Sequence, residues 1–206
     1  MKKRIYSLML GLAIICLTVE VEAQDRVEKF LSRLEAFNAK TTSIVSDFDQ
    51  EQEFSFLDET MEASGQFYFM KPGVMKWDQK SPEAYAFVIK SDEAYKMEGG
   101  KKKNIPLNSP QIAGFKRFLL TTMDGSILQS GDFDVNIGFA NGVVEVDLLP
   151  TKKTMKRMFE KVSLKFDEES LLLKELVFFE TETDFRRIQF SNHQLNTLTD
   201  ATVFTE

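Results

Sequence analysis

The chain has 206 residues, and its 26 Lys and Arg stand against 32 Asp and Glu, so the formal net charge is −6. This length fits one domain with enough residues for a hydrophobic core. The acidic balance argues against nucleic acid as a partner, because phosphate binding needs a basic surface. The single histidine excludes a histidine-rich zinc site, and the single cysteine leaves no pair for a disulfide.

The first residues have the layout of a secretory signal peptide. Three basic residues precede an apolar run over 5–19, and Ala23 offers a small residue for cleavage. The run is too short for a transmembrane helix, which needs about 20 apolar residues. A lipoprotein signal ending at Cys16 is the alternative, but the residue before this cysteine is larger than acyl attachment favours. We therefore predict an exporting signal peptide over 1–23 and a cysteine-free mature domain over 24–206.

The mature chain opens with a helical pattern over 24–40. Its apolar residues recur at spacings of three and four, which places them on one stripe. They are Val27, Phe30, Leu31, Leu34 and Phe37. We therefore predict a helix that packs one face on the core.

From Ser43 the period changes to two, as in a strand. One face carries Ile44, Ser46, Phe48, Gln50, Gln52, Phe54 and Phe56. The other face carries Asp47, Asp49, Glu51 and Glu53. These acids suggest either a cation site or a solvated strand face. The second interpretation is favoured, because no glycine-punctuated calcium loop is present.

The stretch 64–85 reads as strand, tight turn and strand. Alternation places Phe67 and Phe69 on one face of the first strand. Pro72 and Gly73 supply the two turn residues. The faces of the following strands are defined by alternation too, with Met75 and Trp77 on one strand and Tyr85, Phe87 and Ile89 on the next. A curved antiparallel sheet with large apolar groups on one side is predicted.

The middle of the chain combines a short strand over 94–97, a turn at 98–101 and a second helix over 111–123. This helix carries Phe115, Phe118 and Leu119. It is unusually apolar for a segment between loops, so it is either a core helix or a lid over a cavity.

The remaining chain is β-rich. Alternating segments cover 133–139, 144–150, 162–166, 171–179 and 185–190. Asn141-Gly142 is a strong hairpin signal. The basic stretches at 101–103 and 151–158 are either solvated loops or surfaces that dock an anionic partner. The fold class is therefore α+β, with one antiparallel sheet and no second domain.

No catalytic motif appears in the sequence. There is no Gly-x-Ser-x-Gly motif, no glycine-rich phosphate loop and no His-Glu-x-x-His motif. His193 lies in the polar segment SNHQLN and is predicted to be a loop residue. We predict a protein that is not an enzyme and uses neither a metal nor a cofactor.

Phenylalanine and methionine are abundant, with 19 and 9 residues. They either fill a core or line a cavity, and rigid rings with flexible thioethers suit a cavity that receives acyl chains. Burial of lipid would contribute about 0.8 kcal/mol per CH₂.

Several motifs resemble one known family. They are FDQEQ at 48–52, GQFYFMKPGVMKW at 65–77, VEVDLLP at 144–150, VSLKFDEES at 162–170 and a terminal phenylalanine at 204. The mature chain is thereby similar to the LolA-type outer-membrane lipoprotein carriers, as a divergent member. The resemblance implies an open, incomplete β-barrel around an apolar cavity covered by helices. It also implies a periplasmic monomer that receives acylated lipoproteins from an inner-membrane ABC transporter and delivers them to an outer-membrane acceptor.

The resemblance also suggests a site. The cavity wall is predicted to comprise Phe54, Phe56, Phe67, Phe69, Met75, Trp77, Phe87 and Ile89. The lid is predicted to comprise Phe115, Phe118 and Leu119, with Lys71 as its latch. The family has an arginine where Lys71 stands, and a lysine is a point donor without the planar fork. The alternatives are a carrier or sensor of another lipid or glycolipid, and an interaction domain with a filled core.

Overall fold

The computed structural model describes residues 24–57, 59–107, 117–118, 121–122 and 126–205. The predicted signal peptide over 1–23 lies outside this part of the chain. So do Phe115 and Leu119 of the predicted lid.

The helix predicted over 24–40 is confirmed. It buries Phe30, Leu34 and Asn38, which follow one another at intervals of four. Both the backbone N–H and the hydroxyl of Thr41 donate to the Phe37 carbonyl, which closes the last turn. At the other end of the helix Arg26 forms a bidentate pair with Glu168.

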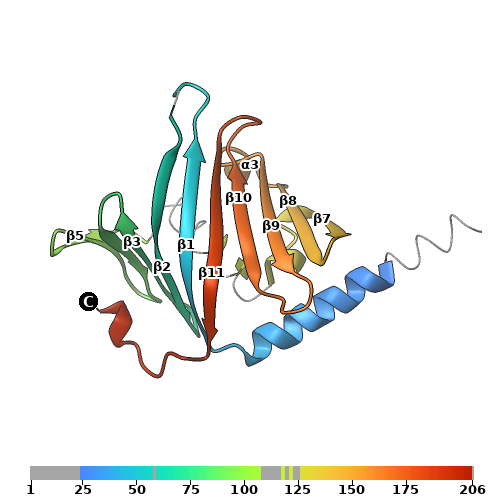
Figure 1. Ribbon diagram of the computed structural model, residues 1–206, viewed down its shortest axis with the longest axis horizontal. Coiled ribbons are helices and arrows are strands. Elements are labelled where there is room, and N and C mark those ends of the chain that lie inside the picture. Colours follow the sequence, from blue (N-terminus) through green and yellow to red (C-terminus); the bar gives the residue numbers. More distant parts are fainter. Residues whose placement is uncertain (1–23, 58, 108–116, 119–120, 123–125, 206) are drawn as a thin grey trace, which may run out of the picture.

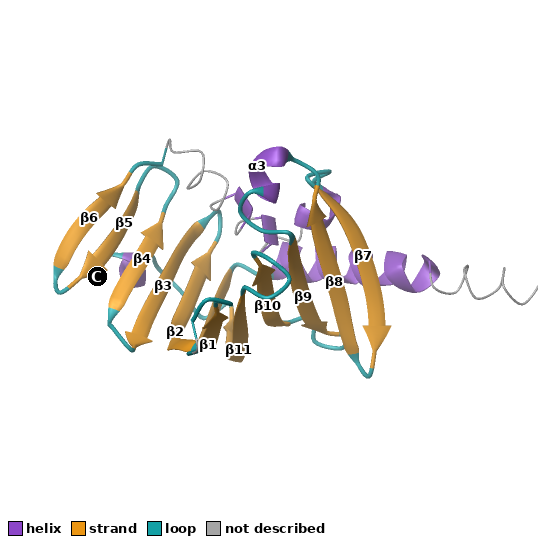
Figure 2. Ribbon diagram, turned by 90° about the horizontal axis from the view of Figure 1, so that it is seen from above, coloured by secondary structure: helices purple, strands orange, loops and turns teal. Residues whose placement is uncertain are grey.

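Eleven strands form one antiparallel sheet within the described residues. They are β1 Ser43–Glu53, β2 Met61–Met70, β3 Val74–Ser81, β4 Tyr85–Ile89, β5 Ala94–Glu98, β6 Lys101–Ile105, β7 Phe133–Ala140, β8 Val143–Pro150, β9 Lys161–Asp167, β10 Leu173–Phe179 and β11 Phe185–Leu195. Their order is β6-β5-β4-β3-β2-β1-β11-β10-β9-β8-β7. The first and last strands therefore pair at the centre, and β6 and β7 are left as edges. Figure 2 shows the resulting arc, open between these two edges. This arrangement confirms the predicted α+β fold with an open, incomplete antiparallel barrel.

Two glycines fix local geometry. Asn141 and Gly142 both have positive φ, 51° and 76°, which is the requirement of the predicted two-residue hairpin. Gly65 of β2 pairs with Gln79 of β3, next to a register shift between the two strands. A Cβ at this position would lie 2.1 Å from the Asp78 carbonyl oxygen. No other residue fits there without displacing β3.

Two basic stretches contain regular structure that the sequence pattern did not indicate. Lys101–Ile105 forms the edge strand β6, and exposed lysines are typical of sheet edges because they discourage further pairing. The stretch over 151–158 contains the short helix α3, Lys153–Lys156. Two 3₁₀ turns, η1 Ser126–Gln129 and η2 Thr202–Phe204, complete the described elements.

The main core lies on the concave face of the sheet. Phe30 of the helix packs its ring against Phe139 of β7 and Phe166 of β9, with centroids 6.1 and 5.8 Å apart. A smaller core lies on the other face, where η2 buries Phe204 against Val88 and Tyr95. The Tyr95 hydroxyl donates to the Phe204 carbonyl at 2.6 Å. The end of the chain is thereby fastened to β4 and β5.

Candidate functional site

A cavity of about 760 Å³ opens on the concave face of the sheet. Its apolar wall consists of Phe67, Met75, Trp77, Phe87, Leu176, Phe178, Ile188 and Phe190. Polar side chains stand at the same cavity, namely Gln50, Gln52, Glu62, Gln79, Glu83, Lys96 and Arg186. The cavity is thus amphipathic and large enough for a small molecule.

Strand register brings the aromatic wall together. Phe67, Trp77 and Phe87 are cross-strand neighbours on β2, β3 and β4. On the far side of β1, Phe190 of β11 packs against Phe67 with ring centroids 6.0 Å apart. Phe48 of β1 stacks on Trp77 at 3.7 Å and supports the wall from the centre of the sheet.

Four of the predicted cavity residues line this cavity, namely Phe67, Met75, Trp77 and Phe87. Phe69 and Ile89 lie on the same face, but they are buried in the main core rather than on the cavity surface. The concave face carries the cavity at one end and the packed main core at the other, and Phe69 and Ile89 lie in the packed part.

Phe54 and Phe56 do not line the cavity. β1 ends at Glu53, so the alternation that placed them inward no longer applies. The backbone N–H of Ser55 donates to the Asp184 carboxylate, and the chain turns between the two hairpins. Phe56 is 76% exposed at the hairpin tip, with its ring 5.3 Å from that of Phe54.

The sequence pattern missed the part of the wall contributed by β10 and β11. Leu176, Phe178, Ile188 and Phe190 all lie at alternating positions of predicted strands, so the local signal was present. What it lacked was the pairing of β11 with β1, which brings these strands beside the first hairpin.

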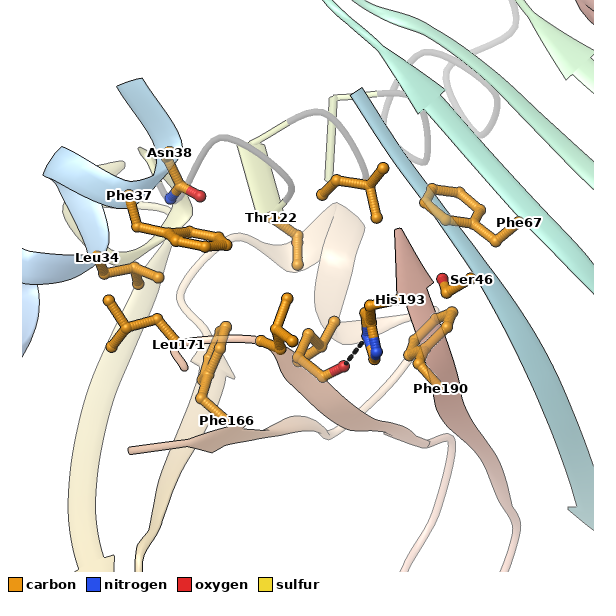
Figure 3. A pocket seen from close by; sticks show the side chains of 13 residues that line it. Leu34, Phe37, Asn38, Ser46, Phe67, Thr122, Phe166, Leu171, Phe190 and His193 are labelled. Carbon is orange, nitrogen blue, oxygen red and sulfur yellow. Dashed lines mark hydrogen bonds between the residues drawn. The ribbon is translucent and has the colours of Figure 1, made fainter. Parts of the chain in front are cut away.

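A second, smaller pocket of about 40 Å³ lies between the helix 24–40 and the sheet (Figure 3). Leu34 and Phe37 of the helix border it on one side and Leu171 on another. Phe67 and Phe190 line both this pocket and the large cavity. The two rings therefore form the partition between the two spaces.

His193 also lines the small pocket, and its prediction as a loop residue was wrong because β11 extends to Leu195. Its Nε2 donates to the Leu173 carbonyl at 2.9 Å (Figure 3). Burial lowers the pKa of His193, and the charge of Lys174 acts in the same direction. The side chain thus joins β11 to β10 in its neutral form.

Of the predicted lid, Phe118 is described. It is buried, and its ring lies 5.3 Å from that of Phe178, which lines the cavity. Phe118 therefore packs against the cavity wall at Phe178. Lys71 donates from Nζ to the Asn38 carbonyl and from its backbone N–H to the Thr42 carbonyl. It fastens the C-terminal end of the helix 24–40, and its role as a lid latch stays a prediction.

Two acids on the acidic face of β1, Asp47 and Glu51, make local contacts with neighbouring strands. Asp47 accepts hydrogen bonds from Asn192 at 2.8 Å and Gln66 at 3.0 Å, and these bonds lower its pKa. Glu51 pairs with Arg187. Among the described residues no cluster of three or more His, Cys, Asp or Glu side chains could hold a metal ion. Within the same ranges no helix is both long and apolar enough to span a bilayer.

Comparison with known proteins adds a family assignment. The model of the family "Outer membrane lipoprotein carrier protein LolA" matches residues 39–206. A comparison with curated protein sequences finds none that matches the chain.

Several solved structures are similar to this chain at low sequence identity. An uncharacterised conserved protein from Thermus thermophilus has a TM-score of 0.56 at 11% identity, over 87% of this chain and 93% of that one. A LolA superfamily protein from Nitrosomonas europaea has a TM-score of 0.45 at 10% identity, over 87% and 97% of the two chains. The lipoprotein LppX from Mycobacterium tuberculosis has a TM-score of 0.48 at 12% identity, over 84% and 98%. On the match of the family model, this chain belongs to the family of LolA outer membrane lipoprotein carrier proteins.

Proposed function

We propose that this protein is a periplasmic carrier that holds the acyl chains of lipoproteins in its large cavity. It takes them from an inner-membrane ABC transporter and delivers them to an outer-membrane acceptor. It acts as a monomer and performs no chemical reaction. The observation that carries the proposal is the unfilled volume of about 760 Å³ behind an aromatic and aliphatic wall in a member of this family.

The energetics of such a carrier are those of apolar burial. Each buried CH₂ contributes about 0.8 kcal/mol, so a long acyl chain binds without a specific polar contact. A carrier must also release its cargo, which a non-directional attraction permits. The alternative is a carrier or sensor of another lipid or glycolipid, which would use the same apolar wall.

Native mass spectrometry of the protein purified from its own periplasm tests the cargo. We expect a triacylated lipoprotein at one-to-one stoichiometry. A free lipid or glycolipid in its place would favour the alternative.

Uptake of a fluorescent fatty acyl probe tests the cavity directly. Phe87 lines the cavity, whereas Phe56 lies outside it and is 76% exposed. Phe87→Asp replaces a ring of the apolar wall by a carboxylate and should abolish uptake, because acyl chains packed against a carboxylate strip it of water, which is costly. Phe56→Asp is the matched control and should bind as wild type does. Absence of uptake by the folded wild type, or equal loss in both variants, would contradict the proposal.

A further inference from the structure

One end of the large cavity is polar, although its position on the concave face calls for apolar residues. On β1, Gln50 and Gln52 continue the inward-facing row that Phe48 begins. On β3, Gln79 lies two residues beyond Trp77 on the same face. A purely apolar ligand would need no amide at any of these positions.

Strand register shows that the polarity changes in one direction. Phe48 is buried and pairs with Phe190, which lines the apolar wall, and with Gly65. Two residues further along β1, Gln50 pairs with Ile188 and Ala63.

The next inward position of β1 completes the change. Gln52 pairs with Arg186 on one side and Met61 on the other. The polar end therefore lies toward the β1–β2 hairpin, at the opposite end of the strands from the helix 24–40 (Figure 1).

The three amides are placed to bind. Gln79 is 8% exposed and donates from Nε2 to the Glu83 carbonyl at 3.0 Å. Gln52 accepts from Arg186 Nε at 3.3 Å. The Gln50 amide makes no hydrogen bond to any residue that the structure describes. The Gln50 side chain is half-buried, so its amide is open to a ligand that carries donors and acceptors.

Charges of both signs lie at this end. Lys96 pairs with Glu98 at 2.8 Å, and Arg186 donates to Gln52. The carboxylates of Glu62 and Glu83 line the same cavity. An anionic head group would meet two carboxylates, and a cationic one would meet two bases. The surroundings favour a head that carries no net charge and forms hydrogen bonds in both directions.

We propose that the amides of Gln50, Gln52 and Gln79 bind the uncharged, hydrogen-bonding head of an acylated ligand, while the acyl chains fill the apolar part of the cavity. The inference rests on the proposed carrier function. Amide groups of an acylated peptide and hydroxyl groups of a glycolipid share this chemistry. The experiment therefore contains one arm for each.

The test is displacement of a fluorescent fatty acyl probe by three ligands with the same two palmitoyl chains. One ligand is an uncharged lipopeptide, the second is a glucosyl diacylglycerol, and the third is the anionic phosphatidylglycerol. For wild type we expect at least one uncharged head to bind about tenfold more tightly than the anionic one, the factor that one or two net hydrogen bonds supply. The tighter of the two uncharged ligands identifies the source of the head.

The double variant Gln50→Leu/Gln79→Leu keeps the side-chain size and removes two of the three amides, leaving Gln52, which already accepts from Arg186. It should still bind the fatty acyl probe, but its preference for the uncharged head should fall to within about twofold, because the net hydrogen bonds are lost. Gln194→Leu, at an exposed position of β11, is the matched control and should keep the preference. An unchanged preference in the double variant, or tighter binding of the anionic lipid by wild type, would overturn the proposal. Failure of wild type to bind the probe would instead overturn the carrier function.

Discussion

The strands β7 to β9 and the strands β1 to β5, β10 and β11 present the same alternation of apolar side chains to the concave face, yet only the second group borders the large cavity. In the first group the face is filled by fully buried aliphatic residues, namely Val144, Val146, Leu148, Val162 and Leu164. In the second group it carries phenylalanine, tryptophan, methionine and glutamine. We call these the filled half and the hollow half.

Coverage explains the difference. The helix 24–40 places Phe30 against β7 and β9 of the filled half. Branched aliphatic side chains interdigitate closely there, as in ordinary protein interiors. In the hollow half large rings stand over the sheet with space between them. The same sheet thus carries a packed core in the filled half and borders the cavity in the hollow half.

Truncating one leucine in each half should give the largest contrast. Leu164 of β9 and Leu176 of β10 are cross-strand neighbours, but only Leu176 lines the large cavity. Leucine-to-alanine changes in cores cost about 2–5 kcal/mol, with the higher values where a new cavity forms. We expect Leu164→Ala near the upper end and Leu176→Ala near the lower end, measured by urea unfolding. Equal costs, or a larger cost for Leu176→Ala, would remove the distinction between the halves.

Filling the hollow half with ligand should stabilise the protein. A fatty acyl ligand at a hundredfold excess over its Kd should raise the free energy of unfolding by about 2.7 kcal/mol. Thermal unfolding with and without ligand measures this rise, and Phe87→Asp should abolish it. A rise of the same size in Phe87→Asp would mean that the ligand binds elsewhere.

The sequence predicted the features that depend on local periodicity. The helix 24–40, the strands around Phe67 and Trp77, and the hairpin at Asn141-Gly142 all follow from spacing within a few residues. Strand β6 was missed because its three lysines mask any alternation.

What local periodicity could not supply is long-range pairing. The cavity wall at Ile188 and Phe190 exists because β11 pairs with β1, and no local pattern specifies that neighbour. The limits of a strand decide which face a residue occupies, and for that reason Phe56 was placed inward although β1 had already ended. The open form of the barrel came from the family resemblance.

Removing the Arg26–Glu168 ion pair, which ties the helix 24–40 to the sheet, should destabilise the filled half less than the leucine truncation does. Arg26 donates to both carboxylate oxygens of Glu168 at 2.8 and 2.9 Å, and its guanidinium lies 4.4 Å from the Phe139 ring centroid. Half of the Arg26 side chain is exposed, so we expect a coupling of only about 0.2–1 kcal/mol. A double-mutant cycle with Arg26→Ala and Glu168→Ala measures it. Probe uptake should not change, and a loss of uptake would show that the helix controls the hollow half as well.

Protonation of His193 should have the smallest effect, at the boundary between the halves. Burial holds its folded pKa below the unfolded value of about 6.5. Above pH 6.5 both states are neutral at this residue, so it contributes no pH dependence. Between the unfolded pKa of about 6.5 and the lower folded pKa, the unfolded state binds the proton more readily than the folded state. The free energy of unfolding therefore decreases as the pH falls through this range. Asp47 affects the free energy of unfolding in a different pH range. Its pKa is lowered in the folded state, so its contribution to stability is lost only as the pH falls below about 4.

Unfolding by urea between pH 7.5 and pH 5 isolates the histidine. His193→Gln keeps an N–H donor for the Leu173 carbonyl but does not titrate. The wild type should lose stability over this range by more than the variant does. If the two curves run parallel, the imidazole is protonated equally in the folded and unfolded states, and the closed packing of β10 against β11 around the small pocket would have to be open to water.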